Sequence, residues 1–320
     1  MKEAITNQDR EFLHTLWNFL PGRIFDAHAH LFPAELFSSR PGAWAHVQKG
    51  DAAEFMQASR ILYGDRPVQA MFLPYPMIEM NVPQCRNRVN AWMAEQLDTV
   101  EGCVAQAYVL PGDTKKDVEA LLIHPGIRGF KCYYTAACGN AGDQSDISEF
   151  LPESVWEVAN ERKLCITLHL VKTLSAADPE NQKYVSTMCR RYADAKLVLA
   201  HCARGFAPWT VMEAARKWEG IGNLYYDLSA ICEPEAMTAV IRSAGADHVM
   251  WGTDYALSHM HNRPYVQGTG FVWRESTQEN PCAMLALESL HGFYQAAKAL
   301  QLTRKQIEDI FCNNALRLLL

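Results

Sequence analysis

Short apolar runs recur along the chain, and most are followed by a segment with apolar residues at helical spacing. The runs cover residues 24–30, 68–73, 103–109, 127–132, 164–169, 196–201, 224–228 and 249–252. They are largely continuous in apolar character rather than alternating, which is typical of strands buried on both faces of a parallel sheet. Helical spacing follows in residues 87–97, 117–123, 154–162, 184–192, 210–218 and 235–243. The pattern therefore predicts eight strand–helix units.

Eight such units in 320 residues favour a (β/α)8 TIM barrel, whose active site lies at the carboxyl ends of the strands. An extra N-terminal helix is expected within residues 7–20, and C-terminal helices at 284–300 and 303–311. A doubly wound open sheet is the alternative, but it predicts a glycine-rich phosphate turn after the first strand, where this chain has two histidines. Because no linker or internal repeat interrupts the pattern, we expect residues 1–320 to form a single domain.

Composition narrows the class of protein. Hydrophobic residues make up 49% of the chain and charged residues 21%, as in soluble globular proteins. The net charge of -6 and the lack of a Lys/Arg-rich run argue against nucleic acid or a membrane as partner. The polar N-terminal stretch lacks the apolar core of a secretory signal. The ten cysteines include no Cys-x-x-Cys pair and are interpreted as reduced core residues, which favours a cytoplasmic location.

Polar residues with metal-binding chemistry fall at the ends of the predicted strands. Taken singly, each has a structural explanation, such as a buried histidine bonded to a carbonyl or an aspartate in a turn. Since all strands of a barrel end at one rim, their joint occurrence there predicts a metal site. The set consists of His28, His30, Lys131, His169, His201 and Asp254.

This constellation resembles the amidohydrolase superfamily of metal-dependent barrel enzymes. The most similar branch is that of its small, barrel-only members, which include hydrolases, lactonases and non-oxidative decarboxylases. The resemblance extends from about Ile24 to the C-terminus. It rests on Asp26-Ala-His28-Ala-His30, Gly129-Phe-Lys131, His169, His201-Cys-Ala-Arg204-Gly205, Trp251-Gly-Thr-Asp254-Tyr255 and Asn313-Asn314-Ala-Leu-Arg317.

The resemblance implies one divalent ion, with zinc favoured and manganese or iron as alternatives. The implied ligands are His28, His30, His169 and Asp254. Asp254 is also the candidate general base acting on metal-activated water, and His201 would orient that water or polarise the substrate.

Lys131 leaves the number of metals open. In two-metal relatives a carboxylated lysine at this position bridges both ions, and the second ion is held by the residues that match His169 and His201. In one-metal relatives the lysine keeps its ammonium group and faces the substrate, which is the arrangement we favour.

Arg204 is a candidate for binding a substrate carboxylate, with a surface salt bridge as the alternative. Tyr133 is a candidate lining residue of the pocket.

These features favour a hydrolase that acts on a small, carboxylate-bearing lactone, amide or ester. The alternative is a metal-dependent non-oxidative decarboxylase of an aromatic or unsaturated carboxylic acid. A nuclease is disfavoured because relatives of that kind carry a glutamate in place of Lys131. A binding protein built on an inactive barrel is disfavoured because no polar position is missing. The partner expected is a small-molecule substrate, and a homodimer is the common state of the family.

The segment 255–281 is predicted to be a loop that serves as a lid or dimer contact. Its two histidines, His259 and His261, are an alternative metal pair that we disfavour.

Overall fold

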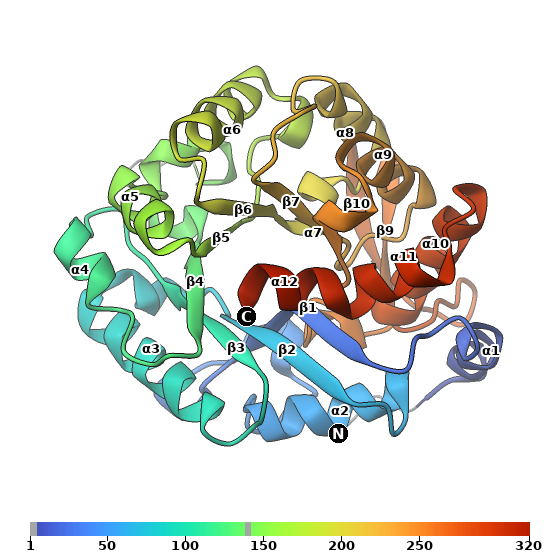
Figure 1. Cartoon of the computed structure of the whole chain (residues 1–320). Coiled ribbons are helices and arrows are strands. Elements are labelled where there is room, and N and C mark those ends of the chain that lie inside the picture. Colours follow the sequence, from blue (N-terminus) through green and yellow to red (C-terminus); the bar gives the residue numbers. More distant parts are fainter. Residues whose placement is uncertain (1–4, 138–141) are drawn as a thin grey trace.

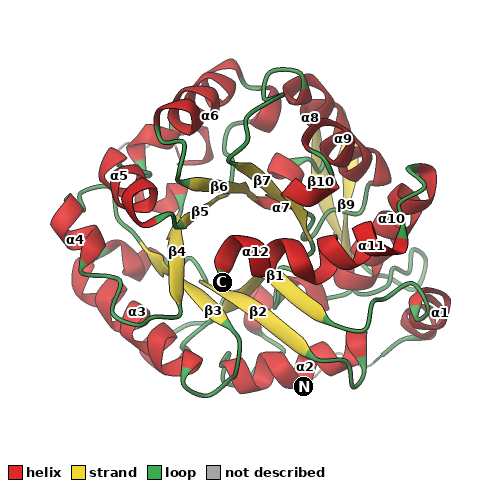
Figure 2. Cartoon of the chain, in the orientation of Figure 1, coloured by secondary structure: helices red, strands yellow, loops and turns green. Residues whose placement is uncertain are grey.

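The chain folds into a barrel of eight parallel strands surrounded by helices (Figures 1 and 2). The computed structural model describes residues 5–137 and 142–320. The strands follow one another around the barrel in chain order. They are β1 (Ile24–Leu31), β2 (Val68–Pro74), β3 (Val104–Tyr108), β4 (Ile127–Cys132), β5 (Cys165–Leu168), β6 (Lys196–Leu199), β7 (Leu224–Asp227) and β8 (Val249–Met250). The predicted (β/α)8 barrel is confirmed, and the single domain over residues 1–320 stays a prediction.

The predicted helices are confirmed with shifted ends, and the helices of the structure surround the barrel, except that the C-terminal helix lies across its interior. They are α1 (Asn7–Leu16), α2 (Ala52–Tyr63), α3 (Pro83–Leu97), α4 (Lys115–Glu119), α5 (Glu153–Arg162), α6 (Pro179–Arg191), α7 (Ala200–Arg204), α8 (Pro208–Ala215), α9 (Pro234–Ala244), α10 (Leu285–Ala299), α11 (Arg304–Glu308) and α12 (Asn314–Leu319). Proline at the first position starts α3, α6, α8 and α9, where its missing N–H costs nothing. In the described part of the chain, no helix combines the length and apolar character needed to cross a membrane.

Apolar side chains fill the barrel from its amino end. Phe25 and Met71, from β1 and β2, pack inside it together with Leu318 and Leu319 of α12. This helix lies across the middle of the barrel in Figure 1. A larger apolar layer packs between the strands and the outer helices. The amino end of the barrel is therefore closed by hydrophobic packing, and the carboxyl end is left for polar groups.

The barrel closes between β1 and the segment that follows β8. Because β8 is only two residues long, three backbone hydrogen bonds of this segment complete the junction. Ala27 N donates to Trp251 O (2.9 Å), Asp254 N donates to His28 O (2.7 Å) and His30 N donates to Tyr255 O (2.8 Å). The register of β1 against β2 also shifts between Asp26 and Ala29, as in a β-bulge. The junction therefore contains both histidines of β1 and the aspartate after β8.

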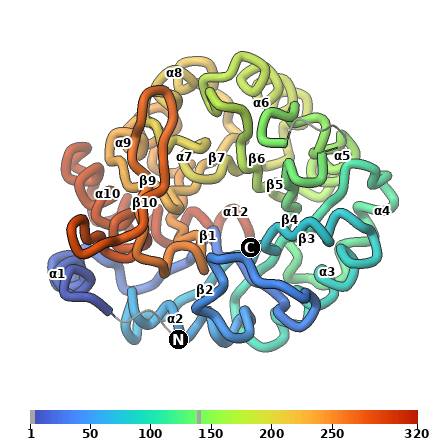
Figure 3. Tube along the Cα trace, turned by 180° about the vertical axis from the view of Figure 1, so that it is seen from behind, coloured from blue at the N-terminus to red at the C-terminus, as the bar shows by residue number. Residues whose placement is uncertain are grey.

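The prediction that residues 255–281 lack regular structure is wrong. Two antiparallel strands, β9 (Asn262–Gln267) and β10 (Gly270–Glu275), form a hairpin in this segment. Gly268 begins its two-residue turn at a φ of 60°, which glycine adopts without strain. Seen from behind the view of Figure 1, the hairpin lies in front of the barrel (Figure 3). The hairpin is therefore at the carboxyl end of the strands, opposite α12.

Candidate metal centre

Two histidine nitrogens and one carboxylate oxygen meet at the junction of β1 and β8. His28 Nε2 lies 3.3 Å from His30 Nε2, and Asp254 Oδ1 lies 3.2 Å from His30 Nε2 and 3.6 Å from His28 Nε2. All three side chains are buried. A tetrahedral zinc ion about 2.0–2.2 Å from each ligand requires ligand atoms about 3.3–3.6 Å apart. The spacing and chemistry of these donors fit a divalent ion.

The backbone after β8 approaches β1 closely enough to bring Asp254 to the histidines. A Cβ atom at Gly252 would lie 2.8 Å from His28 Cβ, so a side chain there would push the two segments apart. Asp254 itself has a φ of 66°, in the left-handed region that costs an L-residue energy. Its N–H bonds the carbonyl of His28, which fixes this conformation. Such conformations often mark functional sites.

The other three predicted strand-end residues face the same centre. One ring nitrogen of His201 lies within 4.8 Å of ligand atoms of His28 and Asp254, so His201 could also contribute to an ion site with these two residues. The ring of His169 lies 5.2 Å from that of His201, and its buried Nδ1 has no hydrogen-bond partner among the described residues. Lys131 is 1% exposed, and its Nζ also has no hydrogen-bond partner within the described ranges. The structure thus brings together all six predicted residues.

Each of three histidines has its Nδ1 atom bonded by a group behind it. His28 Nδ1 lies 2.9 Å from Asp227 Oδ2, and His201 Nδ1 lies 3.0 Å from the carbonyl of Ser229. His30 Nδ1 lies 3.4 Å from the hydroxyl of Tyr133, which itself donates to Pro74 O. Because these oxygens accept hydrogen bonds, the protons are assigned to Nδ1 and each Nε2 keeps its lone pair. Tyr133, predicted to line the pocket, lies behind His30.

Asp227 and Ser229 were not predicted from the sequence. Asp227 also accepts hydrogen bonds from His201 N (3.0 Å) and from the Ser229 hydroxyl. It therefore supports two histidines of the site from β7. Its position at the carboxyl end of β7 is the signal that marked the other site residues, and it could have been found in the same way.

The charge state of the site suits a cation. Burial alone would raise the pKa of Asp254, but its contact with His30 and the nearby His201 and His28 hold this pKa well below its usual range. Burial lowers the pKa of His28 and of His201, and holds the pKa of His169 well below its ordinary value. The centre therefore combines neutral imidazoles with an ionised carboxylate, which is the form in which both bind metals.

Two buried groups next to the centre have unusual protonation behaviour. Burial lowers the pKa of Lys131 to about 8, against the opposing charges of Asp227 and Asp254. Burial raises the pKa of Asp26 to about 7, although Thr253 donates to it through its N–H (3.0 Å) and its hydroxyl (2.5 Å). The Asp26–Thr253 contact joins β1 to the segment after β8, so Asp26 stabilises the junction between them.

The chain turns sharply after β6 to place His201. His201, Cys202, Ala203 and Arg204 all have positive φ angles, between 50° and 58°. Left-handed backbone costs about 1–2 kcal/mol per L-residue, so tertiary contacts must hold this turn. Ser175 Oγ donates to Ala203 O (3.0 Å), and Arg204 Nη1 donates to Lys172 O (2.7 Å). Arg204, predicted to bind a carboxylate, is thus anchored to the loop after β5.

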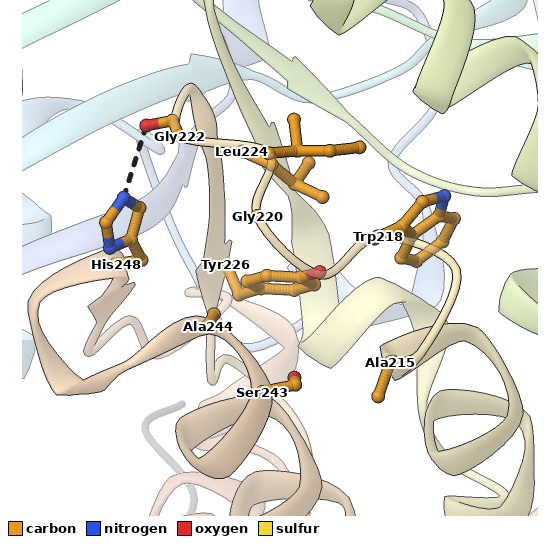
Figure 4. A pocket seen from close by; sticks show the side chains of 10 residues that line it. Ala215, Trp218, Gly220, Gly222, Leu224, Tyr226, Ser243, Ala244 and His248 are labelled. Carbon is orange, nitrogen blue, oxygen red and sulfur yellow. Dashed lines mark hydrogen bonds between the residues drawn. The ribbon is translucent and has the colours of Figure 1, made fainter.

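Other features lie apart from the metal centre. A cavity of about 140 Å³ is lined by Trp218, Tyr226 and His248, near the amino end of β7 (Figure 4). Its His248 Nε2 contacts the carbonyl of Gly222 at 3.2 Å. His261, one of the two histidines considered and disfavoured as an alternative metal pair, contacts Asp9 of α1 at 2.7 Å. Neither group of residues takes part in the cluster at the carboxyl end.

The parallel barrel and the imidazole and carboxylate donors at its carboxyl end define the class of metal-dependent TIM-barrel proteins. A sequence model described as amidohydrolase matches residues 25–320. The chain therefore belongs to the amidohydrolase family, which is metal-dependent, and this confirms the resemblance inferred from the sequence.

Solved structures share the fold at low sequence identity. A putative 2-pyrone-4,6-dicarboxylic acid hydrolase from Pseudomonas putida has a TM-score of 0.60 at 16% identity, covering 94% of this chain and 98% of its own. A 5-carboxyvanillate decarboxylase from Sphingomonas paucimobilis has a TM-score of 0.60 at 12% identity, covering 93% and 99%. A 5-carboxyvanillate decarboxylase from Novosphingobium aromaticivorans, complexed with manganese, has a TM-score of 0.61 at 10% identity, covering 93% and 96%. No curated protein sequence matches significantly.

Proposed function

We propose that this protein is a metal-dependent hydrolase of a small, carboxylate-bearing substrate such as a lactone, amide or ester. The observation that carries the proposal is the placement of Asp254, an ionised carboxylate 3.2 Å from His30 Nε2 and 3.6 Å from His28 Nε2. One oxygen of Asp254 would bind the metal, and the other would act as the general base. A divalent ion bound there supplies Lewis acidity and lowers the pKa of a bound water toward neutrality.

The side chains of the site divide the remaining work of hydrolysis. Asp254 takes a proton from the attacking water and returns it to the leaving group. His201 accepts a hydrogen bond from that water at Nε2, because its Nδ1 donates to Ser229 O. Lys131, whose pKa of about 8 leaves it largely protonated at pH 7, stabilises negative charge that develops on the substrate.

The metal is proposed to be a single zinc or manganese ion. Three donors, from His28, His30 and Asp254, lie at mutual distances of 3.2–3.6 Å, a spacing suited to a single ion. Zinc is favoured by the two imidazoles, and the manganese complex of the Novosphingobium decarboxylase supports manganese as the alternative. A second ion bridged by carboxylated Lys131 is the less favoured arrangement.

Decarboxylation of a carboxylic acid is the second candidate reaction. It is favoured by the likeness to two 5-carboxyvanillate decarboxylases, at TM-scores of 0.60 and 0.61. The likeness to a putative hydrolase of 2-pyrone-4,6-dicarboxylic acid, a cyclic ester with two carboxylates, favours hydrolysis. The intact His28-x-His30 pair favours hydrolysis as well, because decarboxylase relatives often carry Glu-x-His there.

Elemental analysis of protein purified without chelators, with and without bicarbonate, tests the metal site. We expect one zinc or manganese ion per chain, and its loss in His28→Ala and Asp254→Asn with the fold preserved by circular dichroism. Two ions that depend on bicarbonate would replace the one-metal arrangement with a carboxylated Lys131 bridge. No metal even after reloading would contradict the proposal.

A panel of carboxylate-bearing lactones, esters and carboxylic acids tests the reaction. Hydrolysis releases acid without gas, whereas decarboxylation releases carbon dioxide. We expect acid release from lactones or esters by the metal-loaded protein and none after chelation. Carbon dioxide release without hydrolysis would establish the second candidate instead.

A further inference from the structure

A second cavity, of about 320 Å³, lies between the β9–β10 hairpin and the loops after β5 and β6. Arg204, Thr173, Thr269, Phe271 and Trp273 are among its lining residues, and none of the candidate metal ligands is among them. Its size is at the low end of the range for small-molecule pockets, about 300–1,000 Å³.

One aromatic side chain, Phe206, lies between the hairpin side of this cavity and His201 of the metal centre. The ring of Phe206 lies 5.7 Å from that of His201 on one side and 4.4 Å from that of Phe271 on the other. Phe206 does not line the cavity, whereas Phe271 does. The Phe271 and Trp273 rings meet edge to face, with centroids 6.0 Å apart at 84°. The hairpin therefore gives the cavity an apolar side of its own.

Arg204 gives the cavity a positive charge that has no direct carboxylate partner in the part of the chain that the structure describes. The guanidinium is half-buried, its Cζ lies 6.0 Å from the Phe271 centroid, and in the described ranges it has no ion-pair partner within 4.0 Å. Among the described residues, the carboxylate beside it is that of Asp143 on the cavity rim, whose charge opposes the lowering of the Arg204 pKa by burial. A half-buried cation without a direct counter-ion favours an anion beside it.

The position of the guanidinium is fixed by the protein, and within the described ranges one of its donors is used in a hydrogen bond. One N–H at Nη1 is taken by Lys172 O at 2.7 Å, and Ser175 Oγ holds the left-handed turn by donating to Ala203 O. A guanidinium has five N–H donors in a planar fork. The remaining donors match the two oxygens of a carboxylate.

We propose that this cavity is a binding site for a small carboxylate attached to a flat apolar body, with benzoate as the simplest example. Arg204 binds the carboxylate through its fork, and Phe271 and Trp273 pack against the apolar body. The site is distinct from the metal centre and does not rest on the proposed reaction.

Calorimetric titration of the metal-free protein with benzoate tests the proposal. Removing the metal excludes binding of the carboxylate at the other centre. We expect one benzoate per chain, weaker binding of acetate because it lacks the apolar body, and no binding of neutral benzamide. Arg204→Gln should weaken benzoate binding at least about tenfold, as expected for loss of a charge-assisted bidentate contact.

Two further variants complete the test: one should strengthen benzoate binding, and the other is a control that should not change it. Asp143→Asn removes the competing negative charge, so it should strengthen benzoate binding by about two- to threefold, the size expected for a partly exposed charge. Arg66→Gln is the matched control, because Arg66 also donates to a carbonyl (Trp17 O, 3.0 Å) and lies over a ring (Trp17, 4.0 Å), but outside this cavity. It should leave benzoate binding unchanged.

Several outcomes would overturn the proposal. They are undiminished binding in Arg204→Gln, equal affinity for acetate and benzoate, and binding that occurs only in the metal-loaded protein. If Arg204→Gln does not fold, Arg204→Lys keeps the charge but loses the fork and should still weaken binding. Failure here is distinguishable from failure of the proposed hydrolase, because the latter depends on metal content and product analysis.

Discussion

The oxygens behind the histidines of the metal centre determine which ring nitrogen is offered to an ion. Asp227 is the most connected of these groups, since it contacts His28 Nδ1 at 2.9 Å and accepts from His201 N at 3.0 Å. A carboxylate in this place fixes the ring and raises the basicity of the other nitrogen. Asp227 is therefore expected to act on metal affinity without touching the substrate.

Asp227→Asn should weaken metal binding by about 10–100-fold, the usual cost of removing such a partner. Affinity is measured by competition with a chromophoric chelator, and circular dichroism confirms the fold. Asp98→Asn is the control, because it changes an exposed Asp–His pair (His124, 3.3 Å) away from the centre. Equal metal affinity in wild type and Asp227→Asn would show that Asp227 has only a structural role.

Lys131 should make the stability of the metal-free protein depend on pH. Its pKa is about 8 in the folded protein and about 10.4 in an unfolded chain. Between these values the unfolded state binds more protons, so stability rises with pH, by up to about 3 kcal/mol. The unfolding free energies of wild type and Lys131→Met are measured by urea denaturation between pH 7.5 and pH 10, in buffers free of carbon dioxide. We expect the difference between them to grow in favour of wild type as the pH rises. Lys183→Met, which changes an exposed lysine, is the control. A constant difference would refute a buried ammonium at Lys131.

The strand-end residues of the site could be predicted because their position in the sequence repeats with each strand. The partners behind them could not be predicted from local pattern. His28 and Asp227 are 199 positions apart, and only closure of the barrel brings β1 and β7 to the same centre. Simple alternation along β1 would also place Asp26 with the histidines, whereas the shift in register lets Asp26 bond Thr253 instead.

Two elements escaped prediction for different physical reasons. The β9–β10 hairpin is mostly exposed, so it lacks the buried apolar runs by which the barrel strands were found, and its Gly268 turn was the remaining signal. The left-handed turn His201–Arg204 contains no glycine, so nothing in its sequence indicates positive φ. Contacts from Asp227, Ser175 and Lys172 impose this conformation, and such contacts are set by the tertiary fold.

One left-handed residue, at the end of α5, lies outside the metal centre, so the energetic cost of its backbone conformation can be measured separately. Lys163 follows α5 in the left-handed conformation (φ 55°, ψ 37°) and its side chain is exposed. Lys163→Gly should raise the unfolding free energy by about 0.5–1 kcal/mol, because glycine adopts this conformation without a Cβ clash. In α6, Lys183→Gly should lower it by about 1 kcal/mol, since glycine weakens a helix interior. Urea denaturation measures both, and a loss of stability in Lys163→Gly would refute the strain.

The two ends of the barrel divide stability from chemistry. At the amino end α12 fills the opening with Leu318 and Leu319, and at the carboxyl end the polar residues of the metal centre converge. This separation lets the loops of the chemical end vary without loss of the core. Substitutions in the core at the amino end should therefore leave metal affinity unchanged, and substitutions at the carboxyl end should leave the stability of the core unchanged.

Leu319→Ala should lower the unfolding free energy by about 2–4 kcal/mol, because the side chain is 4% exposed and packs inside the barrel. Its neighbour Leu320 is 60% exposed, so Leu320→Ala should change stability by less than about 0.5 kcal/mol. Metal affinity should be the same in both variants and in wild type. A weakened metal site in folded Leu319→Ala would show that the two ends are coupled.

The junction between β1 and the segment after β8 gives the bound ion a mechanical role. His28 and His30 lie on one side of this junction and Asp254 on the other, so an ion that binds all three cross-links the first and last strands of the barrel. Without the ion, the junction is held by three backbone hydrogen bonds and the Asp26–Thr253 contact. Opening of the cylinder should then begin here, and amide hydrogen exchange at His30 and Asp254 should slow on loading the metal far more than exchange in β4 and β5. The ion would therefore hold the barrel closed as well as take part in the reaction.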